Sequence, residues 1–189
     1  MTHRAVVITC SSRAASGVYP DRSGPIIVQT LRQWDLDGLV VDDPVVVPDG
    51  PEVEAALRAA VDSGAALVLT TGGTGLTPTD GTPEATRAVI DREVPGLAEA
   101  IRAYGLAQGV ATAALSRGVA GLAGRTLVVN LPGSPAGCRD GLAVLAEVLP
   151  HAVDQIRGGD HAAARPGAHP AAGQGGHTGA LQGWEGLHG

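Results

Sequence analysis

A glycine-rich segment that carries one aspartate is the part of the sequence best suited to chemistry. Residues 70–86 read TTGGTGLTPTDGTPEAT, in which Gly72, Gly73 and Gly75 follow an apolar run. Glycine tolerates positive φ and close approach of a ligand, so the amides of such a turn can line an anion pocket. The segment lacks the Gly-Lys-Ser/Thr ending of a Walker A loop and the third glycine of a dinucleotide fingerprint. The spacing is compatible with phosphate binding and with a simple chain reversal.

Asp80 lies in the same segment and has no obvious structural task. Thr82 followed by Pro83 fits a helix start, with the threonine as N-cap and the proline in the first turn. A carboxylate beside bound phosphate is repelled unless a cation lies between them, and Mg²⁺ prefers oxygen ligands. The sequence therefore favours a magnesium ligand at Asp80, with a solvated loop aspartate as the alternative.

Asp49 is the second acidic candidate, and for this residue the structural interpretation is the stronger one. It precedes a helical segment, and Glu52 stands three residues later, as in a capping box. A capping carboxylate at the carboxyl end of a strand still faces the cleft of a parallel sheet. We therefore predict a helix cap at Asp49 that remains accessible to a ligand.

Two further segments combine hydroxyl groups, glycine and arginine. Residues 130–135 read NLPGSP, where Ser134 fits the N-cap of a closing helix whose exposed N-terminus can also receive an anion. Residues 9–12 read TCSS and lead into a loop with Arg13 and Arg22. These arginines can neutralise phosphates, although ordinary surface charge is the favoured interpretation.

These segments must meet in space, because the apolar runs before them have the pattern of one buried parallel sheet. Short apolar runs alternate with helical segments along the chain, which predicts a parallel sheet covered on both faces. Ligands bind such sheets at the carboxyl ends of the strands. Cys10, at one of these ends, is interpreted as a small core residue rather than a nucleophile. We expect strands at 5–10, 39–47 (interrupted at 42–44), 66–71 and 125–131, and helices at 23–35, 51–63, 83–92, 96–107 and 135–157.

Composition excludes several classes of function. The 189 residues include 13 arginines, no lysine and 19 acidic residues, which gives a net charge of -6. Without lysine there is no P-loop lysine, Schiff base or lysyl–nucleotide intermediate. The acidic balance and 2% aromatic content argue against nucleic acid, and no apolar run reaches the length of a membrane span. Two cysteines fit no metal or disulfide pattern, so we expect a cytoplasmic protein with reduced thiols.

The composition also predicts the domain organisation. We expect one domain over residues 1–157 and a disordered tail over residues 158–189. The tail is rich in glycine and alanine, contains four of the six histidines and has no apolar period. Such a segment cannot bury enough apolar surface to offset its ordering entropy.

Several segments taken together resemble the MoaB/Mog family of molybdenum cofactor biosynthesis. They are TTGGTG and TPTDGTPEAT within 70–86, LSRG at 115–118 and NLPGSPAG at 130–137, and SSRAASGVYPDRSG at 11–24 fits the family's first loop. The resemblance covers about residues 4–157. It implies a three-layer α/β/α sandwich around a mostly parallel sheet, assembled as a homotrimer. It also implies molybdopterin adenylyltransferase activity, which uses Mg²⁺ and ATP to place AMP on molybdopterin and releases pyrophosphate.

The resemblance also assigns residues and partners. Asp49 and Asp80 take the places of the family's catalytic, metal-binding aspartates, and the downstream molybdenum-insertion enzyme is an expected partner. Two positions depart from the family, because Ser12 and Thr79 stand where Asp and Arg are common. The implied nucleotide- and pterin-binding residues are Ser11, Ser12, Thr71, Gly72, Gly73, Thr74, Gly75, Ser116, Pro132, Gly133 and Ser134.

Two other functions stay open at this point. A nucleotide pyrophosphohydrolase with the same metal site would form AMP without molybdopterin. A pterin-binding module without catalysis, which the departures at Ser12 and Thr79 motivate, would bind the pterin but release no pyrophosphate.

Overall fold

The computed structural model describes residues 3–34, 36 and 38–156, so the predicted tail at 158–189 lies outside the described residues. No helix within these residues is both long and apolar enough to cross a bilayer. The elements are, in chain order, β1 (His3–Cys10), α1 (Ser12–Ala15), α2 (Ser23–Gln33), β2 (Leu39–Val41), β3 (Val45–Val47), α3 (Pro51–Asp62), β4 (Leu67–Thr71), α4 (Thr82–Arg87), β5 (Arg92–Glu93), α5 (Pro95–Ala107), the 3-10 helix η1 (Ala111–Leu115), β6 (Ala120–Ala123), β7 (Thr126–Leu131) and α6 (Pro135–Ile156).

The described strands form one sheet with the order β2-β1-β4-β7-β6-β5, and β3 also pairs with β1. Strand β1 pairs in parallel with β2, β3 and β4, and β4 pairs in parallel with β7. Strands β6 and β5 continue the sheet in antiparallel orientation. The expected mostly parallel sheet is confirmed, as is the interruption between β2 and β3, which both lie along the same side of β1.

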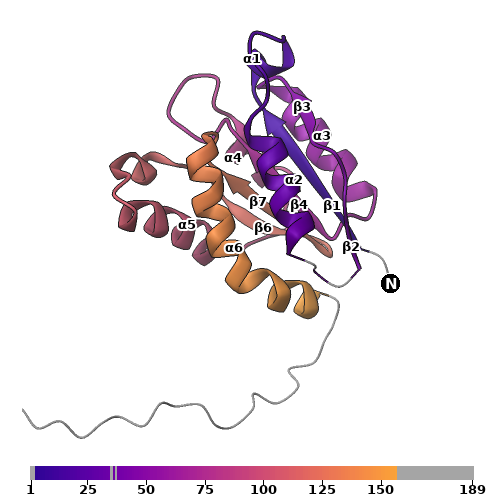
Figure 1. Ribbon diagram of the computed structural model, residues 1–189. Coiled ribbons are helices and arrows are strands. Elements are labelled where there is room, and N and C mark those ends of the chain that lie inside the picture. The colour runs from indigo at the N-terminus through magenta and orange to yellow at the C-terminus, as the bar shows by residue number, and fades with distance from the viewer. Residues whose placement is uncertain (1–2, 35, 37, 157–189) are drawn as a thin grey trace, which may run out of the picture.

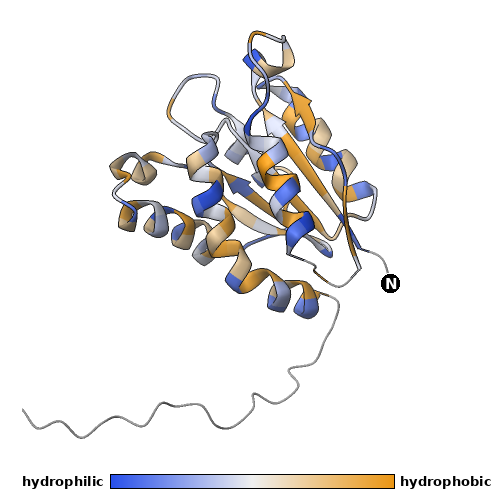
Figure 2. Cartoon of the chain, viewed as in Figure 1, coloured by the Kyte–Doolittle hydropathy of each residue, from blue (hydrophilic) through white to orange (hydrophobic). Residues whose placement is uncertain are grey.

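Side chains that alternate along the central strands supply two cores, one on each face of the sheet. Val7 and Val129 pack with Leu31 of α2 and Leu145 of α6 on one face, where α5 also contributes. On the other face, Val6 and Val68 pack with α3 and α4. Figure 1 shows α2 and α6 in front of the sheet and α3 and α4 behind it. Figure 2 shows why this order is stable, because the central strands are hydrophobic and the helices carry polar residues on their outer sides.

The predicted helix at 83–92 is too long. Helix α4 ends at Arg87, and residues 92–93 form β5, because the backbone of Asp91 and Val94 donates to β6 rather than continuing a helix. Strand β6 itself was not expected. Its sequence AGLA lacks the β-branched residues that mark strands, and its antiparallel pairing with β7 comes from the tight turn at Gly124.

A buried asparagine joins the sheet to α4. Asn130 of β7 donates through Nδ2 to Thr70 Oγ1 and Thr86 Oγ1, at 2.9 Å each, and its Oδ1 accepts from the Val119 N–H at 3.1 Å. All four residues belong to different segments. A buried amide whose donors and acceptor are satisfied in this way fixes those segments relative to one another.

We predict that Asn130→Ala lowers the free energy of unfolding by about 2–3 kcal/mol, because the buried Val119 N–H loses its acceptor. Urea denaturation of both proteins measures the difference. Gln29→Ala, on the exposed side of α2, is the control and is expected to change it by less than about 0.5 kcal/mol. Equal stability of Asn130→Ala and wild type would contradict a structural role for this network.

Candidate functional site

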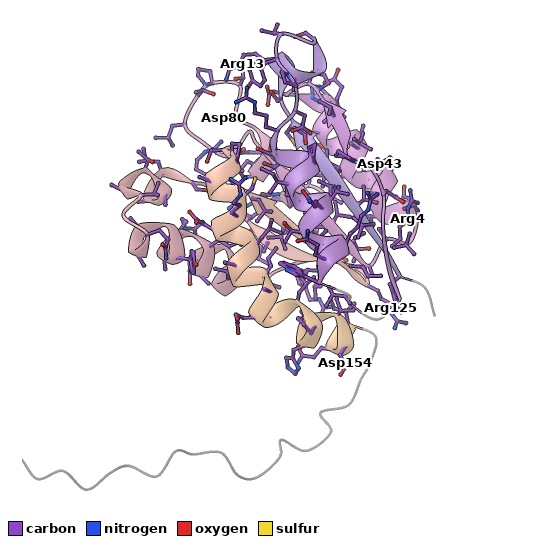
Figure 3. The ribbon with its side chains drawn as sticks, in the orientation of Figure 1. Arg4, Arg13, Asp43, Asp80, Arg125 and Asp154 are labelled. Atoms are coloured by element: carbon purple, nitrogen blue, oxygen red, sulfur yellow. The ribbon has the colours of Figure 1, made fainter. Side chains whose placement is uncertain are left out.

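A cavity of about 670 Å³ lies at the carboxyl ends of the parallel strands, and loops after β1, β3, β4 and β7 surround it. Figure 3 shows Arg13 and Asp80 at this end of the molecule, with Arg4 and Arg125 at the other. A second hollow of about 500 Å³ shares Thr77 with the first. The first hollow receives Ser11, Ser12, Asp49, Thr71, Gly72, Gly73, Asp80 and Gly133 from the predicted set, and the second receives Thr74, Gly75, Ser116, Pro132 and Ser134.

The segment 72–80, here called the glycine loop, depends on glycine for its path. Gly72 has φ +95°, and a Cβ atom there would lie 2.3 Å from the carbonyl oxygen of Cys10. Gly73 has φ +62°, and a Cβ atom there would lie 2.3 Å from Thr82 Oγ1. A Cβ atom on Gly133 would lie 3.1 Å from Gly72 Cα. The loop is thus held closely between the ends of β1 and β7, where side chains do not fit.

Asp49 is held by Ser12, and the predicted helix cap is wrong. Its Oδ2 accepts from the Ser12 N–H at 2.9 Å and from Ser12 Oγ at 2.8 Å, and Ser12 Oγ accepts from the Asp49 N–H at 3.0 Å. Helix α3 begins at Pro51, so Gly50 and not Asp49 occupies the cap position. A Cβ atom on Gly73 would lie 3.4 Å from Asp49 Oδ1, so this second oxygen faces the glycine loop.

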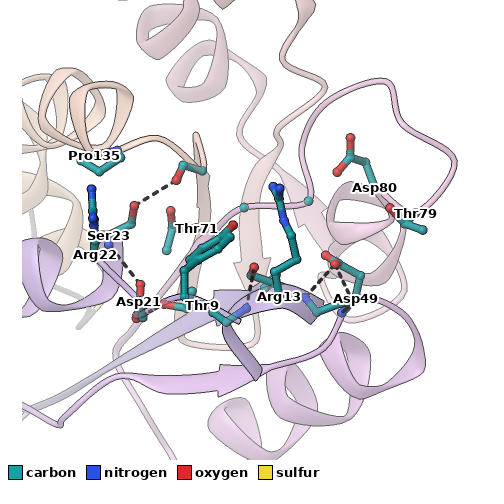
Figure 4. A pocket seen from close by; sticks show the side chains of 18 of the residues that line it. Thr9, Arg13, Asp21, Arg22, Ser23, Asp49, Thr71, Thr79, Asp80 and Pro135 are labelled. Carbon is teal, nitrogen blue, oxygen red and sulfur yellow. Dashed lines mark hydrogen bonds between the residues drawn. The ribbon is translucent and has the colours of Figure 1, made fainter. Parts of the chain in front are cut away.

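Asp80 folds back onto the glycine loop through one oxygen. Its Oδ2 accepts from the Thr77 N–H at 2.9 Å, while the Asp80 N–H donates to the Thr77 carbonyl at 3.0 Å. No hydrogen bond to its Oδ1 occurs in the part of the chain that the structure describes. The predicted cap at Thr82 is wrong, since Thr82 is the first residue of α4 and Gly81 occupies the cap position. Figure 4 shows Asp80 and Asp49 on the same side of the cavity.

Arg13 and Arg22 line the cavity, although both are exposed, so their place is compatible with phosphate neutralisation as well as with ordinary surface charge. The Arg13 guanidinium lies 5.0 Å from the ring centroid of Tyr19, a cation–π contact that orients it. Within the described residues neither arginine forms an ion pair with a carboxylate. Both positive charges are therefore available to an anion in the cavity.

The sequence reasoning missed a set of contacts that ties the first loop to the last. Asp21 Oδ1 accepts from the Ser23 and Gly24 N–H groups at 3.0 Å each, and its Oδ2 accepts from Thr9 Oγ1 at 2.8 Å. Ser23 Oγ then donates to the Gly133 carbonyl at 2.9 Å. The sequence DRSG at 21–24 was a usable signal, because an aspartate two residues before a helix start commonly accepts from the first backbone N–H groups. Ser134 behaves as predicted, because its Oγ accepts from the Gly137 N–H in the first turn of α6.

The two thiols, Cys10 and Cys138, are poorly suited to act as nucleophiles. Burial raises the pKa of Cys10 to about 12, and burial also raises the pKa of Cys138. A protonated thiol is a poor nucleophile at neutral pH. The interpretation of Cys10 as a core residue is supported by its 2% exposure.

Known proteins resemble this chain over most of its described residues. A family model described as "Probable molybdopterin binding domain" matches residues 6–151. A molybdopterin adenylyltransferase of Helicobacter pylori is 39% identical over 153 residues, 80% of this chain and 86% of that protein. A molybdenum cofactor biosynthesis bifunctional protein of Synechococcus elongatus is 40% identical over 163 residues, 85% of this chain, and the chain spans 50% of its length. The structure of the molybdopterin biosynthesis Mog protein from Mycobacterium ulcerans has a TM-score of 0.75 at 54% identity, over 82% of this chain and 99% of that one.

We predict that Gly72→Ala destabilises the protein more than Gly64→Ala does. Both glycines have positive φ, which costs alanine about 1–2 kcal/mol. A Cβ atom on Gly64 would meet nothing within 4 Å, whereas one on Gly72 would press on the Cys10 carbonyl. Urea denaturation of the two variants isolates the cost of this contact. Equal loss in both variants would show that the close approach imposes no constraint.

Proposed function

The chain belongs to the family described as "Probable molybdopterin binding domain", and we propose that it is a molybdopterin adenylyltransferase. It transfers AMP from ATP to the terminal phosphate of molybdopterin and releases pyrophosphate. The observation that carries this proposal is the pair Asp49 and Asp80. Each carboxylate has its Oδ2 fixed by a neighbouring loop group, and within the described residues its Oδ1 accepts no hydrogen bond, in one cavity with two arginines that form no ion pair there.

Transfer of AMP to molybdopterin requires mainly that the reacting groups be positioned and their negative charge be neutralised. A phosphate oxygen of molybdopterin attacks the α-phosphorus of ATP in line, and the bond to the pyrophosphate leaving group breaks. Because the attacking phosphate is already anionic, no strong general base is needed. Fixed dipoles and charges around the transferred group therefore supply most of the acceleration.

Three features of the cavity suit the phosphates of both substrates. Gly72 and Gly73 line the cavity with backbone alone, because the Cys10 carbonyl and the Thr82 hydroxyl already fill the space that their side chains would need. Arg13 and Arg22 offer positive charge, and neither forms an ion pair within the described residues. Ser116 lies in the second hollow, which we assign to the pterin, and the NLPGSP turn separates the two and helps to seat the nucleotide.

The charges that line the cavity fit a magnesium ion that enters with the nucleotide. The lining of the cavity contains two arginines and three aspartates, Asp21, Asp49 and Asp80. Its net charge is therefore negative, and without a cation it repels a polyphosphate. Within the described residues, no group of three or more His, Cys, Asp and Glu side chains forms a metal cluster. Mg²⁺ binds through one or two carboxylates together with phosphates and water, which Asp49 and Asp80 can provide through Oδ1. The ion supplies neutralisation of the triphosphate charge.

The proposal extends to the setting of the enzyme. We place it in the cytoplasm as a homotrimer whose product passes to a molybdenum-insertion enzyme, and we assign the activity to residues 1–157. The names of the relatives support the role in molybdenum cofactor biosynthesis on which this setting depends.

Release of pyrophosphate from ATP and Mg²⁺, measured with and without molybdopterin, tests the proposal. We expect release only when molybdopterin is present. Asp80→Asn is expected to lower turnover about 100-fold or more, because one negative ligand at the transferred phosphates is lost. Its Kd for molybdopterin, measured by calorimetry without ATP, is expected to stay within about 3-fold of wild type.

Asp62→Asn, an exposed carboxylate at the end of α3, is the matched control and is expected to behave as wild type. Release without molybdopterin would identify a nucleotide pyrophosphohydrolase instead. Binding of molybdopterin with no release under either condition would identify a module without catalysis. Equal loss of turnover and pterin binding in Asp80→Asn would exclude its assignment as a metal ligand.

A further inference from the structure

Arg117 reaches from the segment between η1 and β6 to the glycine loop, where it binds backbone rather than ligand. Its Nε donates to the Gly75 carbonyl at 2.7 Å and its Nη2 donates to the Asp80 carbonyl. Its own backbone N–H donates to the Thr74 carbonyl at 2.8 Å. One residue thus holds both ends of the segment from Thr74 to Asp80.

The first residues of the glycine loop are packed against β1 and α4, but its part from residue 76 to residue 79 has few other means of support. Residues 76–79 are exposed, and Leu76 has 64% of its surface accessible, so no apolar side chain anchors the loop at its tip. The hydrogen bonds between Thr77 and Asp80 are internal to the loop and do not attach it to the domain. Beyond Thr74, which is buried, the attachment of this segment to the domain therefore depends on Arg117.

Arg117 is itself fixed at its guanidinium and through its neighbours in the chain. Its Nη1 pairs with Glu84 of α4, and this hydrogen bond is the main reason why the pKa of Glu84 lies below its usual range. Arg102 of α5 donates through Nη1 to the Gly118 carbonyl at 3.0 Å and the Ser116 carbonyl at 3.4 Å. The residues on both sides of Arg117 are thereby attached to α5, which packs in the core against the sheet.

We propose that Arg117 is a positioning residue for Asp80. It fixes the backbone at both ends of the loop segment, and this sets the direction in which the Asp80 carboxylate faces the cavity. The consequence for turnover rests on the proposed function, whereas the positioning itself does not. Arginine is required because its planar group presents donors in a fixed fork that reaches two carbonyls and a carboxylate together, which the single ammonium of lysine does not.

The Thr77 amide provides a direct measurement, because its N–H donates to Asp80 Oδ2 and reports where that carboxylate lies. We expect Arg117→Lys to speed hydrogen exchange at Thr77 and Asp80 at least 10-fold, measured by NMR on the full chain. Exchange in β1, β4 and β7 is expected to match wild type, so a general loss of stability is distinguished from release of the loop. With ATP and molybdopterin, kcat is expected to fall about 10-fold or more, with the KM for molybdopterin unchanged.

Arg87→Lys is the matched control. Arg87 lies on α4, as Glu84 does, and pairs with Glu93 of β5, but it makes no hydrogen bond to the glycine loop. Thr77 exchange in Arg117→Lys no faster than in Arg87→Lys would overturn the proposal. Faster exchange at Thr77 with an unchanged kcat would overturn its catalytic consequence. If wild type transfers no AMP but Thr77 exchange still rises, the proposed function fails while the positioning by Arg117 stands.

Discussion

The site depends on the close approach of the glycine loop to the end of β1. The parallel register sets Thr9 beside Thr71, so β1 and β4 reach the edge of the sheet at the same level. The chain then turns at Gly72, whose backbone lies against the Cys10 carbonyl and beside Gly133 from the turn after β7. Three strand ends that are far apart in the sequence are brought together where only glycine fits. The absence of side chains at this point lets these loops pack closely together at one wall of the cavity.

The two aspartates share a mode of attachment that follows from this geometry. Asp49 is fixed by the first loop through Ser12, and Asp80 is fixed within the glycine loop through the Thr77 N–H. In each case one oxygen is used by the protein, so the direction of the other is determined before a ligand arrives. Phosphoryl and nucleotidyl transfer require mainly pre-organised charged groups from the protein, since the substrate itself provides the nucleophile.

The sequence predicted the core of the fold well and the attachment of the site poorly. Continuous apolar runs identify β1, β4 and β7, because strands buried on both faces admit little else. Strands β5 and β6 escape this reasoning, since two residues at the sheet edge, and four next to them that are mostly alanine and glycine, leave no pattern. The predicted caps at Asp49 and Thr82 failed because capping rules consider only neighbours in sequence, whereas Asp49 is held by Ser12, 37 residues away. Arg117 escaped for the same reason, because its three acceptors lie on a distant loop and on α4.

The departures at Ser12 and Thr79 are best understood as electrostatic changes of opposite sign. An aspartate at position 12 would place a second carboxylate against Asp49, whereas the serine hydroxyl donates to that carboxylate and accepts from its backbone. An arginine at position 79 would add a positive charge to the cavity wall, where Thr79 instead lies within hydrogen-bond distance of Thr77 at 3.3 Å. Against the pattern that the resemblance implies, one negative and one positive charge are both replaced by neutral side chains, so the two departures cancel in net charge. The glycine loop then relies on Arg117, a cation from outside the loop, to hold the segment that carries Asp80.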